Sequence, residues 1–297
     1  MRLGDLTLNY KEQYDKYLKI FNCELTKAIK TFSNAPKILA DAMEYAIVGG
    51  GKRIRPILLL ATADALGVEL NLVVKFAVAI ECIHSYSLVH DDLPAMDNDN
   101  FRRGKPSTHK QFGEAFGVLA GDALLNFAFE YVLSKDNFSN KDAKALKLLA
   151  EFAGFSGMIA GQVLDIQNEN NINPNQQILF SIYENKTAKL LTAPLLIASI
   201  FADDKYYENL ERFGFNLGIM FQFSDDIIDA KGNLDNIGKT PGKDSEQDKL
   251  TSIKLYGFDG ANECKKTYYD NCISALKQLE NNNFLIELTK NIYERNK

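Results

Sequence analysis

The stretch KLLTAPLLIASIFA (189–202) decides the fold class, because as a helix it would be apolar on nearly every side. The stretch ALLNFAFEYVL (123–133) has the same character. Helices that are apolar all round are typical of the centre of a large bundle. Elsewhere, apolar residues recur at three- and four-residue spacing rather than in strict alternation, which predicts helix through most of the chain. The expected helices are 36–49, 56–66, 71–92, 113–134, 141–168, 176–202, 204–230 and 261–280.

The chain has 297 residues. A loose prior of roughly 150 residues per domain therefore allows one domain or two. No alternation of strand and helix patterns supports a parallel sheet. The breaks between the helical stretches, at 49–51, 134–142, 168–175 and 231–249, are too short and too evenly spread to separate domains. We therefore expect an all-α fold in which residues 1–297 form a single domain, a large helical bundle.

Charge and composition exclude several classes of protein. Acidic residues outnumber basic ones, 39 to 34, so the net charge of −5 argues against a nucleic acid or an anionic membrane as a partner. No apolar run reaches the ~18 residues of a membrane-spanning helix, and the first residues lack the apolar core of a signal peptide. The four cysteines form no CxxC pair. We expect a cytoplasmic protein without stable membrane insertion.

Two aspartate clusters have a similar sequence pattern, DDLPAMDNDNFRRGKP (91–106) and DDIIDAKGNLDNIGKTPGK (225–243). Each begins with an aspartate pair at the end of an apolar helix. Like charges four residues apart cost roughly 0.2–0.5 kcal/mol, and the helix dipole disfavours an anion there by a further ~0.3–1 kcal/mol. Bound hard cations would make this arrangement of carboxylates favourable, because Mg²⁺ prefers carboxylate ligands together with phosphate oxygens.

Alternative roles for these acidic segments fit the sequence less well. A solvated acidic helix end accounts for one such cluster more easily than for two in the same position. An EF-hand loop at DNDNF (97–101) lacks the glycine and the closing glutamate at the required offsets. A phosphate-binding loop at Gly232…Gly238-Lys239-Thr240 is one residue too long and follows no strand.

Basic residues are placed as a phosphorylated ligand would require. The segment GGKRIRP (50–56) joins a flexible turn to three bases, and Arg102 and Arg103 closely follow the first aspartate cluster. Arginine binds phosphate oxygens in a bidentate fork, whereas lysine acts as a point charge. His84 lies seven residues before Asp91, about 10 Å along a helix and on almost the same face. It is either a satisfied core histidine or a donor to a ligand oxygen.

These motifs together resemble the trans-isoprenyl diphosphate synthases, and among them most closely the bacterial farnesyl diphosphate synthases, whose first aspartate motif also has four residues between the aspartate pair and the last aspartate. The resemblance covers nearly the whole chain. Its motifs are GGKRIRP (50–56), ECIHSYSLVHDDLPAMDNDNFRRGKPSTH (81–109), GMIAGQVLD (157–165), KTAKL (186–190), FQFSDDIID (221–229), GKTPGKD (238–244) and YERNK (293–297).

The resemblance implies a bundle around a deep central active-site cavity, with the two aspartate motifs facing each other, and a homodimer. It implies that three Mg²⁺ ions are held on the allylic diphosphate by Asp91, Asp92, Asp97, Asp225, Asp226 and Asp229. The diphosphate of isopentenyl diphosphate would be bound by Lys52, Arg55, His84 and Arg103. The allylic diphosphate would be held by Arg102, Lys186, Lys239 and Lys249, with Thr187 and Gln222 beside the reacting carbons.

The chain departs from the family pattern at a few positions. Asn98 and Asn100 stand where close relatives often have aspartate, which leaves the implied ligands in place. The run DKLTSIK around Lys249 differs from the usual one, which makes Lys249 the least secure assignment. Gln162 and Asp165 match a family motif and have either a supporting role beside the site or a role in helix packing.

The implied reaction condenses isopentenyl diphosphate with dimethylallyl or geranyl diphosphate to give farnesyl diphosphate. It needs no nucleophilic side chain, and the sequence offers no serine or cysteine triad. A geranylgeranyl diphosphate synthase is the alternative within the class. Two further alternatives fit the sequence less well. A noncatalytic subunit of a heteromeric synthase commonly lacks an aspartate motif, and both motifs are complete here. A terpene cyclase would not need the isopentenyl site that GGKRIRP implies.

Product length is expected to depend on the residues just before Asp91. Tyr86 and Ser87 lie about 6–8 Å back along that helix, where the growing tail would pass. In the family, an aromatic residue at the position of Tyr86 looks like a farnesyl-length stop. The alternative is that Tyr86 is only a packing residue.

Overall fold

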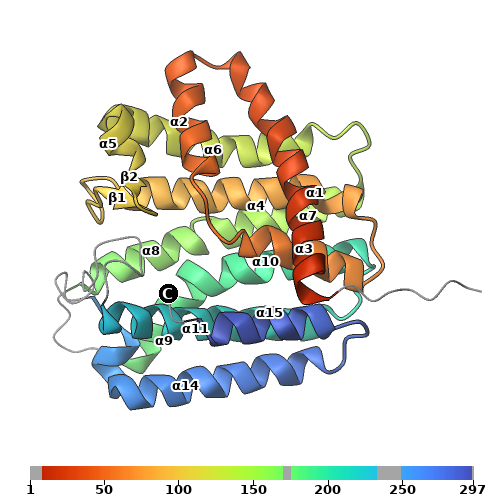
Figure 1. The fold of residues 1–297 in the computed structure, drawn as a ribbon, viewed down its shortest axis with the longest axis vertical. Coiled ribbons are helices and arrows are strands. Elements are labelled where there is room, and N and C mark those ends of the chain that lie inside the picture. The colour runs from red at the N-terminus through yellow and green to blue at the C-terminus, as the bar shows by residue number, and fades with distance from the viewer. Residues whose placement is uncertain (1–8, 170–174, 233–248, 296–297) are drawn as a thin grey trace, which may run out of the picture.

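The computed structural model describes residues 9–169, 175–232 and 249–295 and is almost entirely helical (Figure 1). Its helices are α1 (Tyr10–Lys30), α2 (Lys37–Val48), α3 (Ile54–Ala65), α4 (Leu70–Asp91), α5 (Thr108–Phe112), α6 (Glu114–Leu133), α7 (Asn140–Ala153), α8 (Met158–Gln167), α9 (Gln176–Ile182), α10 (Lys189–Phe201), α11 (Tyr207–Lys231), α14 (Ser252–Leu276) and α15 (Asn283–Tyr293). A 3₁₀ turn covers Thr31–Asn34, and a π-helical segment, Tyr183–Ala188, joins α9 to α10. The strands β1 (Phe101–Arg102) and β2 (Lys105–Pro106) form a short antiparallel hairpin. The all-α prediction is confirmed.

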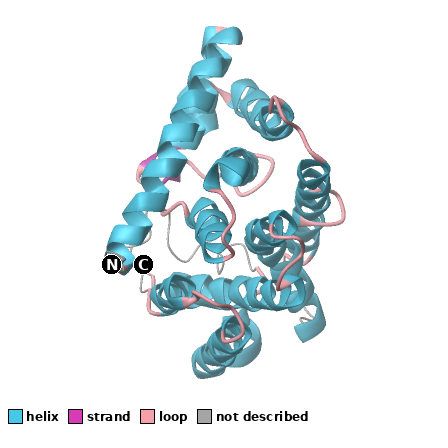
Figure 2. Ribbon diagram, turned by 90° about the vertical axis from the view of Figure 1, so that its right-hand side faces the viewer, coloured by secondary structure: helices cyan, strands magenta, loops and turns pink. Residues whose placement is uncertain are grey.

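The apolar stretch that decided the fold class forms α10, and every residue from Leu190 to Phe201 is buried. Helices α3, α4, α7 and α11 pack against it. Figure 2 views many helices nearly end-on and shows outer helices arranged around inner ones. A core of this size is what the apolar content of these helices predicts, since each buried leucine or isoleucine contributes roughly 1.5–3 kcal/mol.

Two expected helices are interrupted, in each case with a packing reason. The stretch 141–168 divides into α7 and α8 at Gly154–Gly157, where a Cβ on Gly157 would lie 2.1 Å from the carbonyl oxygen of Phe152. The stretch 176–202 contains the π-helical segment, which widens the helix for one turn. Backbone contacts between segments determine both the break and the π-helical segment. The periodicity of apolar residues along the sequence carries no information about such contacts.

Helices α1 and α15 were not among the expected helices. Helix α1 begins with a capping box in which Asn9 and Glu12 each accept a hydrogen bond from the other's backbone N–H. Its buried side chains Tyr17, Phe21 and Leu25 follow helical spacing. This signal was present in the sequence, but the many charged residues between these positions obscured it.

Two helices, α4 and α6, are long and apolar enough to cross a membrane by length and composition alone. Charged residues such as Lys75, Glu81 and Asp122 interrupt them, which is why neither forms an unbroken apolar run. In α4, 72% of the most apolar window is buried within the protein, and in α6 the figure is 39%. The expected absence of membrane insertion stays a prediction.

Candidate active site

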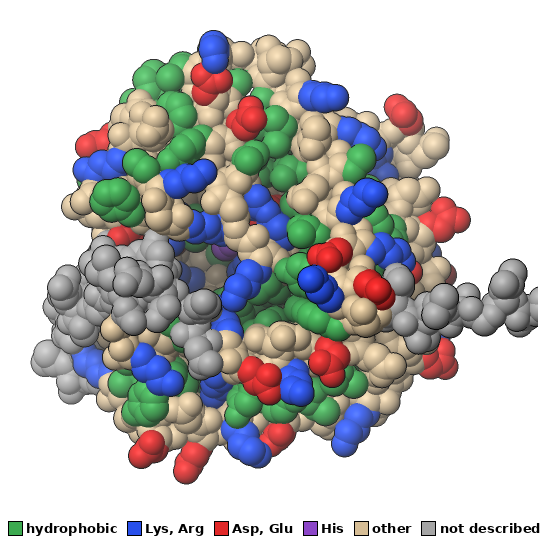
Figure 3. Space-filling model, viewed as in Figure 1, with side chains coloured by type: hydrophobic (Ala, Val, Ile, Leu, Met, Phe, Trp, Pro, Cys, Tyr) green, Lys and Arg blue, Asp and Glu red, His purple; other side chains and the backbone are tan. Residues whose placement is uncertain are grey.

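A cavity of about 810 Å³ lies between α3, α4, α6, α8, the π-helical segment and α11. Figure 3 shows the hollow in this face of the molecule, with Lys and Arg side chains around it. Most of the residues implied by the sequence line it, namely Lys52, Arg55, His84, Tyr86, Ser87, Asp91, Asp97, Arg102, Arg103, Lys186, Thr187, Gln222, Asp225, Asp226, Asp229 and Lys249. Asp92 lines a second, smaller cavity instead, and Lys239 lies outside the described residues. The structure therefore brings residues from distant parts of the sequence to one place.

The first aspartate cluster sits where α4 ends. Asp91 is the last helical residue and Asp92 is the C-cap, so both face the unfavourable end of the helix dipole, as the sequence predicts. The backbone N–H of Asp97 donates to the carbonyl oxygen of Asp91 over 2.9 Å, which folds the loop back toward the cavity. Burial raises the pKa of Asp91, and the nearby charge of Asp97 raises it further, while Lys186 and Arg102 offset only part of this effect.

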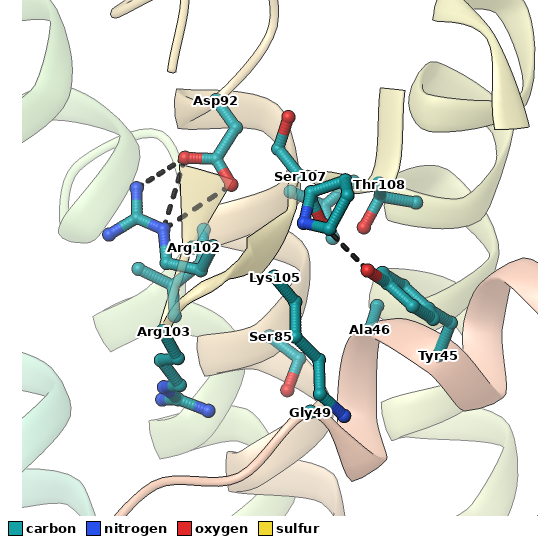
Figure 4. Close-up of a pocket in the computed structure, with 13 residues that line it drawn as sticks. Tyr45, Ala46, Gly49, Ser85, Asp92, Arg102, Arg103, Lys105, Ser107 and Thr108 are labelled. Atoms are coloured by element: carbon teal, nitrogen blue, oxygen red, sulfur yellow. Dashed lines mark hydrogen bonds and ion pairs between the residues drawn. The ribbon is translucent and has the colours of Figure 1, made fainter. Parts of the chain in front are cut away.

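Arg102 holds Asp92 in a two-pronged ion pair. Its Nε lies 3.1 Å from Oδ1 of Asp92, and its Nη2 also contacts that oxygen (Figure 4). The same Nη2 lies 3.6 Å from Asp99. The short hairpin β1–β2 carries Arg102 to this position. Burial raises the pKa of Asp92, and the hydrogen bonds from Arg102 offset only part of this effect.

A much smaller cavity of about 40 Å³ lies behind this ion pair, between α2, α4 and the hairpin (Figure 4). The Tyr45 hydroxyl donates to the carbonyl oxygen of Pro106 across it, over 2.7 Å. These contacts pack the hairpin against α2 and hold Arg102 in place.

The second aspartate cluster sits near the end of α11, and its three carboxylates differ. Asp225 and Asp229 are both partly exposed to the cavity, as residues four apart on one helix face should be. Asp225 pairs with Arg295, which follows α15. Asp226 is 4% exposed and its Oδ2 accepts hydrogen bonds from the Tyr183 hydroxyl and from Ser252.

Two lysines stand between the clusters. Nζ of Lys186 lies 2.6 Å from Oδ2 of Asp165, and Nζ of Lys249 lies 2.9 Å from Oδ1 of Asp97 and 4.0 Å from Asp165. Burial alone would lower the pKa of both lysines, but Asp165 and the first aspartate cluster more than offset it, so both pKa values are raised. Both side chains therefore carry a full positive charge into the cavity. A supporting role for Asp165 has a geometric basis in these contacts.

The cationic end of the cavity is formed by GGKRIRP and its neighbours. Burial lowers the pKa of Arg55 to about 10, so its guanidinium stays charged near neutral pH. Its buried Nε has no hydrogen-bond partner among the residues that the structure describes. Burial and the nearby arginines hold the pKa of His84 well below its usual value, which leaves a neutral imidazole. Arg103 donates to the carbonyl oxygen of Gly50.

Gly51 has a positive φ of 114°, and a Cβ there would lie 2.7 Å from the Arg103 guanidinium. The turn thus needs glycine both for its backbone conformation and for the close approach of Arg103.

Arg53, the middle base of the motif, does not line the cavity as a free cation. Its Nη1 lies 2.6 Å from Oε1 of Glu81, and its Nη2 donates to the carbonyl oxygen of Ile47. Glu81 lies one helical turn before His84 on α4, so this buried pair fixes the motif against the helix that carries the first aspartates.

The two residues proposed for product length differ in orientation. Tyr86 is 5% exposed, lines the cavity, and its buried hydroxyl has no partner within the described ranges. The Ser87 hydroxyl donates to the carbonyl oxygen of His84, so it is turned back onto its own helix. Burial raises the pKa of Tyr86 to about 12.

Sequence reasoning missed three side chains of this site. Arg295, Tyr183 and Glu81 all line the cavity, and each contacts a predicted residue or motif. Arg295 and Glu81 fall within two of the motifs that carry the resemblance, YERNK and ECIHSYSLVHDD, but spacing alone indicates no role for either. Tyr183 had no signal, since its partner Asp226 is 43 residues away.

A metal ion at this site would need ligand oxygens from a bound phosphorylated molecule in addition to protein side chains. Within the described ranges, no three carboxylate, histidine or cysteine side chains converge closely enough to hold a metal ion by themselves. Asp91, Asp97, Asp225 and Asp229 nevertheless supply hard oxygen donors to one cavity, beside arginines and lysines that suit a diphosphate. The residues therefore fit Mg²⁺ bound jointly with a phosphorylated ligand.

An all-α bundle whose cavity brings two aspartate clusters together with several arginines and lysines suits a class of proteins that act on phosphorylated ligands. The chain belongs to the polyprenyl synthetase family, which its residues 36–289 match.

The relatives agree with this assignment. A farnesyl diphosphate synthase of Micrococcus luteus is 40% identical over 95% of this chain and 96% of its own. Geranylgeranyl pyrophosphate synthase 4 of Arabidopsis thaliana is 40% identical over 88% of this chain and 72% of its own. A Helicobacter pylori geranyltransferase solved with magnesium and isoprenyl diphosphate has a TM-score of 0.80, 31% identity and 98% coverage of both chains. The resemblance seen in the sequence motifs is confirmed.

Proposed function

We propose that this chain is a short-chain prenyltransferase that condenses isopentenyl diphosphate with dimethylallyl or geranyl diphosphate to form farnesyl diphosphate. The observation that carries the proposal is a single cavity lined by carboxylates of both aspartate clusters and by basic side chains from several segments. The family resemblance assigns these basic side chains to two diphosphates. The identity to farnesyl diphosphate synthases over most of the chain supports the same reaction.

Isopentenyl diphosphate would bind at the end of the cavity that holds Lys52, Arg55, His84 and Arg103. An oxygen of its diphosphate would satisfy the buried Nε of Arg55. The neutral imidazole of His84 can donate one hydrogen bond without adding charge.

The allylic diphosphate would lie between the aspartate clusters. Arg102, Lys186 and Lys249 would hold its oxygens, and we assign the same role to Lys239, outside the described residues. Their charges stabilise the charge that grows on the diphosphate as the allylic carbon–oxygen bond breaks. Mg²⁺ would be held chiefly by Asp91, Asp97, Asp225 and Asp229, and when bound it adds positive charge at the leaving group. The resemblance implies three ions, and it also includes Asp92 and Asp226 among their ligands.

Thr187 and Gln222 would lie beside the reacting carbons. The Thr187 hydroxyl donates to Oε1 of Gln222 over 2.8 Å, so their oxygens can face an allylic cation without offering a free nucleophile. Apolar side chains such as Phe221 and Leu125 complete the lining and exclude water, which would otherwise trap the cation. The double bond of isopentenyl diphosphate then attacks the cation, and the departing diphosphate takes the proton that is lost.

Farnesyl rather than geranylgeranyl diphosphate is proposed as the product because Tyr86 projects into the cavity just behind Asp91. Its ring packs edge-on against His90, with ring centroids 5.8 Å apart, so it cannot easily move aside. A noncatalytic subunit is less consistent with two complete aspartate clusters.

We propose that the chain acts as a homodimer. Exposed apolar side chains gather on α6 (Phe116, Val118, Leu119) and on α8 (Ile159, Val163), and both helices also line the cavity. Such patches commonly mark an interface. A second copy of this chain is the occupant we propose, as the family resemblance implies.

We also propose a single domain over 1–297 and a cytoplasmic location. One core cluster includes residues from Tyr17 to Ile292, which supports one domain. All four cysteines are free, as a reducing compartment would keep them.

The test uses purified protein, radiolabelled isopentenyl diphosphate and each allylic diphosphate in turn, with product length read by chromatography. We expect farnesyl diphosphate to form with Mg²⁺, and incorporation to fall to background in EDTA and return when Mg²⁺ is restored. Undiminished incorporation in EDTA would contradict the metal role. A product consistently one isoprene unit longer would favour the geranylgeranyl alternative.

A further inference from the structure

Asp226 differs from the other carboxylates of the site because three hydrogen bonds from a tyrosine, a serine hydroxyl and a backbone amide converge on one of its oxygens. Its Oδ2 accepts hydrogen bonds from the Tyr183 hydroxyl, from the backbone N–H of Ser252 over 2.6 Å and from the Ser252 hydroxyl over 2.8 Å. Its Oδ1 accepts from Nε2 of Gln222 over 3.3 Å. A carboxylate oxygen with three donors has little capacity left for a cation.

Asp225, the next residue in the sequence, has the opposite environment. Its side chain is 44% exposed, it lines the cavity, and it pairs with the cation of Arg295. A metal ion can replace one cation at Asp225. To bind Oδ2 of Asp226, a metal ion would have to displace three hydrogen bonds. To bind Oδ1, it would have to displace the contact with Gln222.

The donors to Asp226 come from two segments that carry predicted substrate-binding residues. Tyr183 begins the π-helical segment that contains Lys186 and Thr187. Ser252 is the first residue of α14, three residues after Lys249. Asp226 therefore connects α11 to both segments at once, and through Gln222 it also orients the hydrogen bond to Thr187.

The π-helical segment is held tightly enough for such a connection to position it. A Cβ on Gly161 of α8 would lie 2.1 Å from the backbone nitrogen of Lys186, and one on Gly218 of α11 would lie 2.3 Å from Cα of Ala188. Both glycines allow backbone to pack directly on the segment. π-Helical turns occur frequently at functional sites.

We propose that Asp226 is a positioning residue rather than a metal ligand: with Tyr183 and Ser252 it fixes Lys186, Thr187 and Lys249 around the allylic diphosphate. This inference rests on the proposed function and replaces, for this residue, the ligand role implied by the family resemblance. Loss of the network should lower turnover while leaving the affinity for metal unchanged.

The test compares Tyr183→Phe, Ser252→Ala and Asp226→Asn with Asp225→Asn. We expect each of the first three to lower kcat, by at least tenfold for Asp226→Asn, while the Mg²⁺ concentration for half-maximal activity stays within twofold of wild type. Asp225→Asn should raise that concentration at least tenfold. Tyr256→Phe is the matched control, because it removes another buried hydroxyl on α14 that has no partner among the described residues.

A second measurement needs neither turnover nor metal. Hydrogen exchange of the Ser252 amide in the metal-free protein should be at least tenfold faster in Tyr183→Phe and Asp226→Asn, and unchanged in Asp225→Asn and Tyr256→Phe. The double variant Tyr183→Phe/Asp226→Asn should lose little more kcat than Asp226→Asn alone, since both changes break one network.

Three results would overturn the proposal: an Mg²⁺ requirement that rises as much in Asp226→Asn as in Asp225→Asn, wild-type turnover in Tyr183→Phe, or unchanged Ser252 exchange in Asp226→Asn. Failure of the proposed function would look different. The wild-type protein would then form no prenyl product, while the exchange results would still show whether Asp226 holds Ser252.

Discussion

The two aspartate clusters line the same cavity, yet the chain neutralises them in different ways. Around the first, Arg102 holds Asp92 and Lys249 holds Asp97, so basic side chains of the protein balance two of its three carboxylates. Around the second, Arg295 reaches Asp225, and neutral hydroxyl and amide groups hold Asp226. Among the described residues, basic side chains hold two carboxylates of the first cluster, whereas the second shows one arginine contact and several neutral donors, so the two should respond differently to substitution.

The largest effect should follow from removing a carboxylate of the second cluster that faces the cavity. We expect Asp225→Ala to lower turnover on the order of 10³-fold, the upper range for losing one electrostatic group at a reacting centre. The assay is incorporation of labelled isopentenyl diphosphate at saturating Mg²⁺. Glu263→Ala, on α14 outside the cavity lining, is the control and should retain wild-type turnover. Turnover within tenfold of wild type in Asp225→Ala would remove the basis for a metal at this cluster.

In the first cluster, breaking the Arg102–Asp92 ion pair should reduce stability, in addition to the loss of turnover expected from the role of Arg102 in binding the allylic diphosphate. Replacing Arg102 with glutamine leaves Asp92 buried without its cation, so the free energy of unfolding should fall by about 3 kcal/mol. Without Arg102 the pKa of Asp92 rises further, so the folded state takes up a proton more readily than the unfolded state. Stability is then regained as pH falls, and the deficit of the variant should be smaller at pH 5 than at pH 8.

Urea unfolding at both pH values measures this difference. Arg212→Gln makes the same change of charge at an exposed position and should shift stability by no more than about 0.5 kcal/mol. An equal deficit for Arg102→Gln at pH 5 and pH 8 would show that Asp92 is not the carboxylate left unpaired.

The features of the fold and site that could be predicted from the sequence are those that depend on residues close together in the chain. The apolar faces of α4, α10 and α11 and the aspartate pairs at the ends of two of them follow from spacing along a single helix. The contacts that distinguish the clusters do not, since Lys249 and Asp97 are 152 residues apart and Arg295 and Asp225 are 70 apart. Spacing also cannot separate Asp225 from Asp226, because their different surroundings come from α14 and the π-helical segment. The role of each carboxylate is thus set by packing between elements.

Aromatic residues shortly before each aspartate pair extend the comparison to product length. Tyr86 lies five residues before Asp91 and lines the cavity, where we propose that it limits the growing tail. Phe221 lies four residues before Asp225 and is covered by the Arg295 guanidinium, 4.0 Å from its ring centroid. We expect Tyr86→Ala to give products at least one isoprene unit longer, with similar total incorporation. Tyr86→Phe should keep the wild-type length, because the hydroxyl has no partner in the described part of the chain. Chromatography of the products measures both, and unchanged length in Tyr86→Ala would make Tyr86 only a packing residue.

The smallest effect should come from replacing Arg295, the basic residue that pairs with Asp225 in the second cluster. Arg295 occupies Asp225 in this structure, so it must compete with Mg²⁺ for the same carboxylate. A partly exposed ion pair is worth no more than about 1 kcal/mol, so Arg295→Gln should lower the Mg²⁺ concentration for half-maximal activity by at most about fivefold. Lys290→Gln removes an exposed charge from α15, one turn before its end, and should leave that concentration unchanged. If Arg295→Gln instead raised the Mg²⁺ requirement, Arg295 would be assisting the metal-bound state rather than competing with the metal for Asp225.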